Sequence, residues 1–157
     1  MAKSDEKSAD LKSMMGRLED TLTTYLVDKA PFQLPSGAKE AIVKYGPWIT
    51  LILLILALPA LLFAFGLGTF LAPFAFLGGL QAGVSYGFGM VFSAVILVLE
   101  ALAIPGLFKR KLSAWRLIYY GALLGGVQSV LSFNLGGLVI GTGISLYILF
   151  QIKSYYK

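Results

Sequence analysis

Glu100 has the clearest potential for chemistry, because it is the only acidic residue in positions 45–157 and stands within a long apolar run. Placing a carboxylate inside a bilayer costs about 2.5–3.5 kcal/mol on insertion scales, so such a residue usually has a partner or a function. Arg116 is expected near the same end of the next helix, and the two side chains are predicted to form an ion pair. Two alternatives stay open: a carboxylate that reaches the interface, and a site that couples to protons or cations.

Gln128 is a second polar residue in the middle of an uncharged run. Interhelical hydrogen bonds in membranes contribute only about 0.6 kcal/mol on average, so Gln128 is predicted to join two helices rather than mark a pathway. A contact with a substrate or a pore is the alternative. Small residues recur every four positions in the last third of the chain, which predicts close packing of two helices: Gly121, Gly125, Ser129, Gly137, Gly141 and Ser145.

Catalysis is not expected from this sequence. The chain has no Cys and no His, which excludes thiol chemistry, disulfides, histidine-bound metals and any triad with an imidazole base. We therefore predict a protein that is not an enzyme and that holds no cofactor and no metal. Aromatic residues near the basic segments, such as Trp115 and Tyr119, are interpreted as a belt at the membrane surface. No nucleic-acid partner is expected.

The composition places the chain in a lipid bilayer. It is 57% hydrophobic and only 13% charged, whereas a soluble domain has roughly 25% charged residues. No charged residue occurs in 45–99 or in 117–152. Uncharged apolar runs of about 20 residues are long enough to cross a membrane as helices.

We predict an all-α integral membrane protein with four transmembrane helices in an antiparallel bundle. The expected spans are about 47–65, 83–104, 114–133 and 138–152, within a membrane domain of 36–157 that follows a cytoplasmic arm of 1–35. The apolar stretch 66–81 is expected to form an interfacial cap. A re-entrant element and misplaced ends of the first two spans are the alternatives.

The positions of the basic residues predict the orientation. Acidic and basic residues balance in 1–44, so the net charge of +5 comes from 45–157. Basic residues near span ends mark the cytoplasmic side. Four spans place Lys44, 109–111, Arg116 and Lys153 on one side, with both termini in the cytoplasm. The first 20 residues lack the apolar core of a signal peptide, and we expect the plasma (inner) membrane.

The arm is predicted to contain an amphipathic helix over 8–30. Apolar residues at helical spacing form one stripe: Leu11, Met14, Met15, Leu18, Leu22, Tyr25 and Leu26. The opposite face carries both signs of charge, which favours contact with protein over contact with lipid. Self-association, another protein partner and the base of the bundle are all left open. After a break at 30–35, a short interfacial helix is expected over 37–45, capped by Ser36.

These features favour a non-enzymatic membrane protein that acts by assembly or scaffolding. The alternative is a small oligomeric transporter or channel that uses Glu100 and Gln128. In size and number of predicted spans the chain resembles the small multidrug transporters, and that resemblance implies an essential glutamate in the first span and no N-terminal arm. Here the acid stands in the second span and an arm precedes the first, so no family is assigned.

Overall fold

The computed structural model describes residues 2–157, with side chains from Lys7 onward, and contains helices but no strand within that range. Three helical stretches are long and apolar enough to cross a membrane: Ser36–Gly78, Leu80–Phe108 and Gly137–Tyr155. A helix satisfies its own backbone hydrogen bonds, as hydrocarbon surroundings require. The prediction of an all-helical chain with apolar, membrane-length helices is confirmed.

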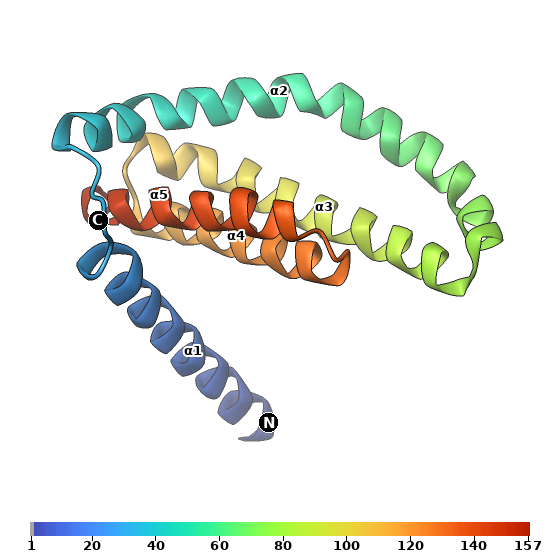
Figure 1. The fold of residues 1–157 in the computed structure, drawn as a ribbon, viewed down its shortest axis with the longest axis horizontal. Coiled ribbons are helices and arrows are strands. Elements are labelled where there is room, and N and C mark those ends of the chain that lie inside the picture. Colours follow the sequence, from blue (N-terminus) through green and yellow to red (C-terminus); the bar gives the residue numbers. More distant parts are fainter. Residues whose placement is uncertain (1) are drawn as a thin grey trace.

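The helices follow one another with short connections (Figure 1). Several helical segments follow one another without a break in the chain and differ only in their winding. The bounds are α1 Ala2–Thr23 with the π-helical turn η1 Thr24–Asp28, α2 Ser36–Ala75 with the 3-10 turn η2 Phe76–Gly78, α3 Leu80–Phe108, α4 Leu112–Leu131, the π-helix η3 Gly137–Gly143, α5 Ile144–Ile152 and the 3-10 turn η4 Lys153–Tyr155.

Helix α2 is one continuous arch rather than three separate elements (Figure 1). The expected interfacial helix, the first span and most of the stretch 66–81 all belong to it. Pro47, at the expected start of the first span, lies well inside the helix, as do Pro59 and Pro73. Each proline removes one backbone hydrogen bond and bends the helix, but a complete break would expose many more unpaired groups. Ser36 is the first residue of the helix and Pro35 occupies the cap position, so the predicted cap at Ser36 is wrong.

Helix α3 also continues past its expected end. Pro105 and Gly106 lie inside it, and the helix ends at Phe108. The chain reverses at Arg110, whose φ of 51° is in the left-handed region. Helix α4 then begins at Leu112, with Lys111 in the cap position, slightly before the expected start at about 114. A methyl group on Gly106 would approach the Cβ of Ala114 to 2.6 Å, which shows how closely the two helices meet at this turn.

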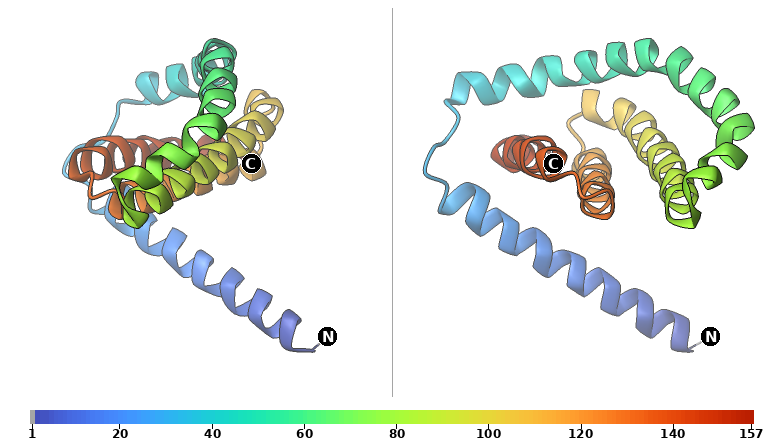
Figure 2. Two further views of the ribbon diagram at one scale, coloured as in Figure 1. Left: turned by 90° about the vertical axis from the view of Figure 1, so that its right-hand side faces the viewer. Right: turned by 45° about the vertical axis from the view of Figure 1, so that its right-hand side comes forward.

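Helix α4 lies between α3 and the C-terminal helix formed by η3 and α5 (Figure 2). Its most extensive contact is with α3 rather than with the C-terminal helix. The small residues of 121–145 predicted close packing between α4 and the C-terminal helix, but the main neighbour of α4 is α3. The turn after α4 is stabilised by Asn134, whose Oδ1 accepts a hydrogen bond from the backbone N–H of Gly137 at 2.9 Å. That contact is a typical N-terminal cap.

The buried core lies at the end of the bundle that holds the C-terminus. Trp115, Tyr119 and Phe150 are almost fully buried there. The Trp115 and Tyr119 rings stack with centroids 5.4 Å apart, and Phe150 packs edge-on against both. Trp115 and Tyr119 therefore belong to the core and not to the belt of surface aromatics that the sequence suggested. Away from this end, large apolar side chains cover the outer surface of α2 and α3.

Helix α1 joins the bundle only at its C-terminal end. It then diverges from the other helices toward the N-terminus in all three views (Figures 1 and 2). A helix lies where the amphipathic helix was predicted over 8–30, because α1 and η1 end at Asp28, and a break precedes the start of α2 at Ser36. Leu22, Leu26 and Val27 pack against the core, which supports the base of the bundle as one contact of the apolar stripe.

Candidate functional site

Glu19 connects the arm to the bundle through two basic residues. Its carboxylate lies 2.9 Å from Lys153 Nζ and 3.5 Å from Arg116 Nε. Only 8% of Glu19 is exposed. The Lys153 ammonium also lies 5.4 Å from the centre of the Trp115 ring and 5.7 Å from that of Phe150. This cluster fixes the direction in which α1 leaves the bundle.

Hydrogen bonds to the backbone reinforce the same junction. Gln151 is 2% exposed and donates from Nε2 to the carbonyl of Leu26 at 2.8 Å. The Tyr147 hydroxyl donates to the carbonyl of Phe32. These carbonyls belong to the last turn of the arm and to the linker, where no regular helix supplies a donor. The C-terminal helix thus holds the arm from two sides.

The C-terminus itself closes the turn between α3 and α4. Lys157 donates its backbone N–H to Arg110 O at 2.9 Å and accepts from Leu112 N at 2.8 Å. Arg110 also forms an ion pair with Glu40 at 2.7 Å, which connects this turn to the start of α2. Tyr156 is 7% exposed beside this turn, and burial raises the pKa of its phenol while the Arg110 charge partly offsets that effect.

The predicted ion pair between Glu100 and Arg116 is not among the ion pairs of residues 7–157, because Arg116 contacts Glu19 instead. Glu100 lines a cavity of about 220 Å³ between α2 and α3. Its neighbours there are Thr50 and five apolar residues: Leu53, Leu54, Ala57, Leu61 and Leu97. The Thr50 hydroxyl bonds to Gly46 O within its own helix at 2.9 Å.

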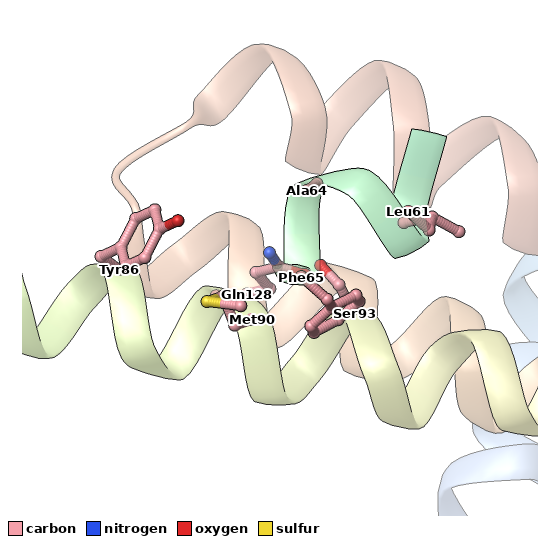
Figure 3. Close-up of a pocket in the computed structure, with 8 residues that line it drawn as sticks. Leu61, Ala64, Phe65, Tyr86, Met90, Ser93 and Gln128 are labelled. Carbon is pink, nitrogen blue, oxygen red and sulfur yellow. The ribbon is translucent and has the colours of Figure 1, made fainter. Parts of the chain in front are cut away.

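Gln128 lines three separate cavities, which makes it the central polar residue of the bundle interior. One cavity of about 290 Å³ lies between α2, α3 and α4 (Figure 3). Its walls are Leu61, Ala64, Phe65, Tyr86, Gly89, Met90, Ser93 and Gln128. A second, of about 270 Å³, lies on the other side of Gln128 and Gly89 and is lined also by Ser85 and Ser132. The predicted interhelical bond of Gln128 is absent from the hydrogen bonds of the described side chains.

Gly68 brings α2 into contact with α3 beside the first cavity. A methyl group there would lie 2.7 Å from the Tyr86 hydroxyl oxygen and 2.9 Å from Met90 Cε. Leu61 lines both this cavity and the one that holds Glu100. The two cavities therefore follow one another along the seam beneath the α2 arch.

The predicted small-residue seam lines a groove instead of a closed contact. Gly125 and Gly141 face a space of about 340 Å³ between α4 and the C-terminal helix. A methyl group on either would find no described heavy atom within 4 Å. One close approach is at the neighbouring Gly126, where a methyl group would lie 2.9 Å from Thr142 Cγ2, and another is at Gly137, where it would lie 3.2 Å from Ser129 Oγ. The groove is lined also by the other predicted packing residues Ser129, Gly137 and Ser145, whereas Gly121 faces Ile96 of α3.

One sequence motif also belongs to this region. Gly83, Ser85 and Gly87 have the G-x-S-x-G spacing of a hydrolase nucleophile. That motif works on a strained turn between a strand and a helix, beside a histidine. Here all three residues lie inside α3, and the sequence has no histidine. The motif therefore carries no catalytic assignment.

Neither metal chemistry nor relatives identify the chain. No group of three potential metal ligands occurs in the part of the chain that the structure describes. No protein-family model, curated protein or solved structure matches the sequence. The function must therefore be inferred from the junction at Glu19, the cavities around Gln128 and the distribution of apolar surface.

Proposed function

We propose that the chain is a four-span membrane protein with both termini in the cytoplasm, and that it acts by assembling with a second copy through α1. Helix α4 supplies the fourth span. Its 20 residues extend about 30 Å at 1.5 Å per residue, which matches the hydrocarbon core. Helix α4 is less apolar than the three stretches of membrane length. This is consistent with its place between α3 and the C-terminal helix, where other protein surfaces cover two of its sides.

The position of the charges supports this orientation. Arg110, Arg116 and Lys153 lie in ion pairs at the same end of the bundle as the arm. Basic residues resist translocation, so this end is assigned to the cytoplasm. The opposite turns around Gly79 and Asn134 carry no charge in the sequence. With an odd number of spans, the arm and the C-terminal residues would lie on opposite sides of the membrane, although their charged side chains contact one another.

The rigidly held arm is the observation that carries the assembly proposal. The junction at Glu19 fixes α1, yet Leu11, Met14 and Leu18 remain 62%, 57% and 42% exposed. A helix whose apolar stripe is uncovered is stabilised when another surface buries that stripe.

A second copy is the occupant that fits the charges best. Acidic and basic residues interleave along the exposed part of α1 and nearly cancel. A basic surface helix would suit anionic lipid, and a strongly charged face would suit an oppositely charged partner. A mixed face complements another copy of itself in an antiparallel pair, which is the usual self-complementary geometry of a symmetric dimer.

Light scattering of the full chain in a mild detergent tests the proposal. The expected mass is that of a dimer or a larger assembly, and Leu11→Glu with Met14→Glu should reduce it to that of one chain. Ser13→Glu is the matched control, because position 13 lies on the opposite face of the same helix. A parent protein that runs as a single chain, or an assembly unaffected by the double variant, would contradict the proposal.

A second candidate is a small oligomeric transporter or channel that uses Glu100 and Gln128. The observation that favours it is the row of cavities beneath the α2 arch, which places both residues along one seam. Proteoliposomes loaded with a pH-sensitive dye test it. Proton flux that depends on the protein and falls at least about ten-fold in Glu100→Gln would support it. Equal flux with and without protein would reject a proton-coupled pathway.

A further inference from the structure

The cavity between α2, α3 and α4 combines apolar walls with a small number of polar groups. Leu61, Ala64 and Phe65 of the arch cover one side, and Met90 of α3 adds another apolar surface (Figure 3). Tyr86, Ser93 and Gln128 supply a phenol, an alcohol and an amide. None of the described residues that line it is charged. Apolar walls with a few polar groups are typical of small-molecule sites.

The three polar side chains have no protein partner. Among the described side chains, the Gln128 amide, the Tyr86 hydroxyl and the Ser93 hydroxyl take part in none of the hydrogen bonds. An unpaired polar group in hydrocarbon is costly, and membrane helices normally satisfy such groups from neighbouring helices. Three of them around one cavity indicate that something other than protein completes their hydrogen bonding.

The size of the space limits what can fill it. The cavity measures about 290 Å³, and the one beyond Gln128 and Gly89 measures about 270 Å³. A water molecule occupies about 30 Å³ of liquid volume. Water alone would leave most of the Leu61, Phe65 and Met90 surfaces wet, which is unfavourable. A molecule with an apolar body and one polar group matches both parts of the lining.

We propose that this cavity binds an uncharged, mainly apolar molecule with a single alcohol or carbonyl group, and that the Gln128 amide forms a hydrogen bond with that group. The Gln128 amide can both donate and accept, and Tyr86 and Ser93 can do the same through their hydroxyls. A charged headgroup is excluded because no described residue of the lining would neutralise it. The site is independent of assembly through α1, since all of its lining residues belong to α2, α3 and α4 of one chain.

Photolabelling of the full chain in nanodiscs of a neutral phospholipid tests this site. The probe is hexadecanol with a diazirine near the middle of its chain, and the labelled residues are located by mass spectrometry. Saturable labelling of residues 61–65 or 86–93 is expected. Unlabelled hexadecanol should displace the probe at least about ten-fold better than hexadecane, which has no polar group, or palmitate, which is charged.

Variants separate hydrogen bonding from folding. Gln128→Leu should weaken displacement by hexadecanol about five-fold, the effect expected for one lost hydrogen bond. Tyr86→Phe keeps the ring and should weaken it by a smaller factor. Gln81→Leu is the control and should have no effect on displacement, because Gln81 lies on α3 with Tyr86 but outside the lining of the cavity. Equal displacement by hexadecane or palmitate, labelling that does not saturate, or binding unchanged in folded Gln128→Leu and Tyr86→Phe would overturn the proposal.

Discussion

Glu19 and Lys153 form a 2.9 Å ion pair that joins the first helix of the chain to the last. The carboxylate is nearly buried, so it would be strongly unfavourable there without a partner. Arg116 supplies a second positive charge at 3.5 Å. Because these three residues come from α1, α4 and the C-terminal turn, Glu19 connects the arm to two other elements, beside the hydrogen bonds that hold Leu26 and Phe32.

We predict that Glu19→Gln lowers the free energy of unfolding by about 1–3 kcal/mol, because it leaves Lys153 and Arg116 without their anion. The arm should also be released from the bundle. Limited proteolysis of the linker at 29–35 measures that release, and thermal unfolding in one detergent measures the stability. Faster cleavage is expected in the variant.

Glu40→Gln is the matched control for this change. Its ion pair with Arg110 is shorter, at 2.7 Å, but the two side chains are 50% and 43% exposed. Exposed ion pairs contribute less than about 1 kcal/mol. If both variants lost the same stability, burial of Glu19 would not be the source of its effect.

The contact between α4 and the C-terminal helix gives a second prediction. Gly126→Leu should destabilise the chain by about 1–3 kcal/mol, since its first added carbon already lies 2.9 Å from Thr142. Gly125→Leu should be tolerated within about 0.5 kcal/mol, because its side chain enters open space. Thermal unfolding of the two variants is compared with that of the parent. Equal losses at these adjacent positions would contradict the packing seen here.

Charge and hydropathy along the sequence were sufficient to predict an all-helical chain with helices of membrane length, and they placed a helix over 8–30 where α1 and η1 lie. Both features depend on local composition, which the sequence contains directly. The continuity of α2 could not be read in the same way. Pro47, Pro59 and Pro73 are reliable helix breakers in water, but the apolar surroundings of this helix favour keeping every other backbone bond intact.

The partner of Arg116 shows why pairing was harder to predict than helices. Glu100 was the obvious candidate because no other acid lies near the spans. The true partner, Glu19, is one of seven acids in 1–44. A signal was nonetheless present: at 100° per residue Glu19 falls at the edge of the apolar stripe, beside Met15, Leu22 and Leu26. An acid in that place must be paired when the stripe is buried.

The predicted small-residue contact is present where Gly137 meets Ser129, but it is shifted by one position at Gly125. A four-residue repeat drifts around a helix of 3.6 residues per turn, so it does not define a single contact face. Gly125 was predicted to be in contact, yet Gly126 meets Thr142. The cavity residues Tyr86 and Ser93 could not be found from the sequence, because only the curvature of α2 leaves space above them.

Topology is tested by single cysteines, which are unambiguous because the chain has none of its own. Ser113→Cys lies at the start of α4, and Leu135→Cys, 72% exposed, lies in the turn after it. In intact cells or spheroplasts an impermeant thiol reagent should label position 135 and should reach 113 only after the membrane is opened. Labelling of 113 from outside would reject four spans with a cytoplasmic N-terminus.

The two tryptophans provide the last prediction, because one lies in the core and one at the surface. Trp115 is 0% exposed and donates from Nε1 to Leu149 O at 2.8 Å, whereas Trp48 is 56% exposed and only meets the edge of Phe108. Trp115→Phe removes that donor and opens a small void in the core. We expect a loss of about 2–3 kcal/mol.

Trp48→Phe should cost less than about 1 kcal/mol, since it removes mostly exposed surface. Circular dichroism during unfolding in mixed micelles measures both changes. The Trp48→Phe protein also isolates the emission of Trp115, which should shift to longer wavelength in the same transition, because the ring that packs α4 against α5 becomes solvated only when the core opens. Equal stability of the two variants, or a Trp115 signal that changes before the helices unfold, would show that this aromatic cluster is not what holds the base of the bundle together.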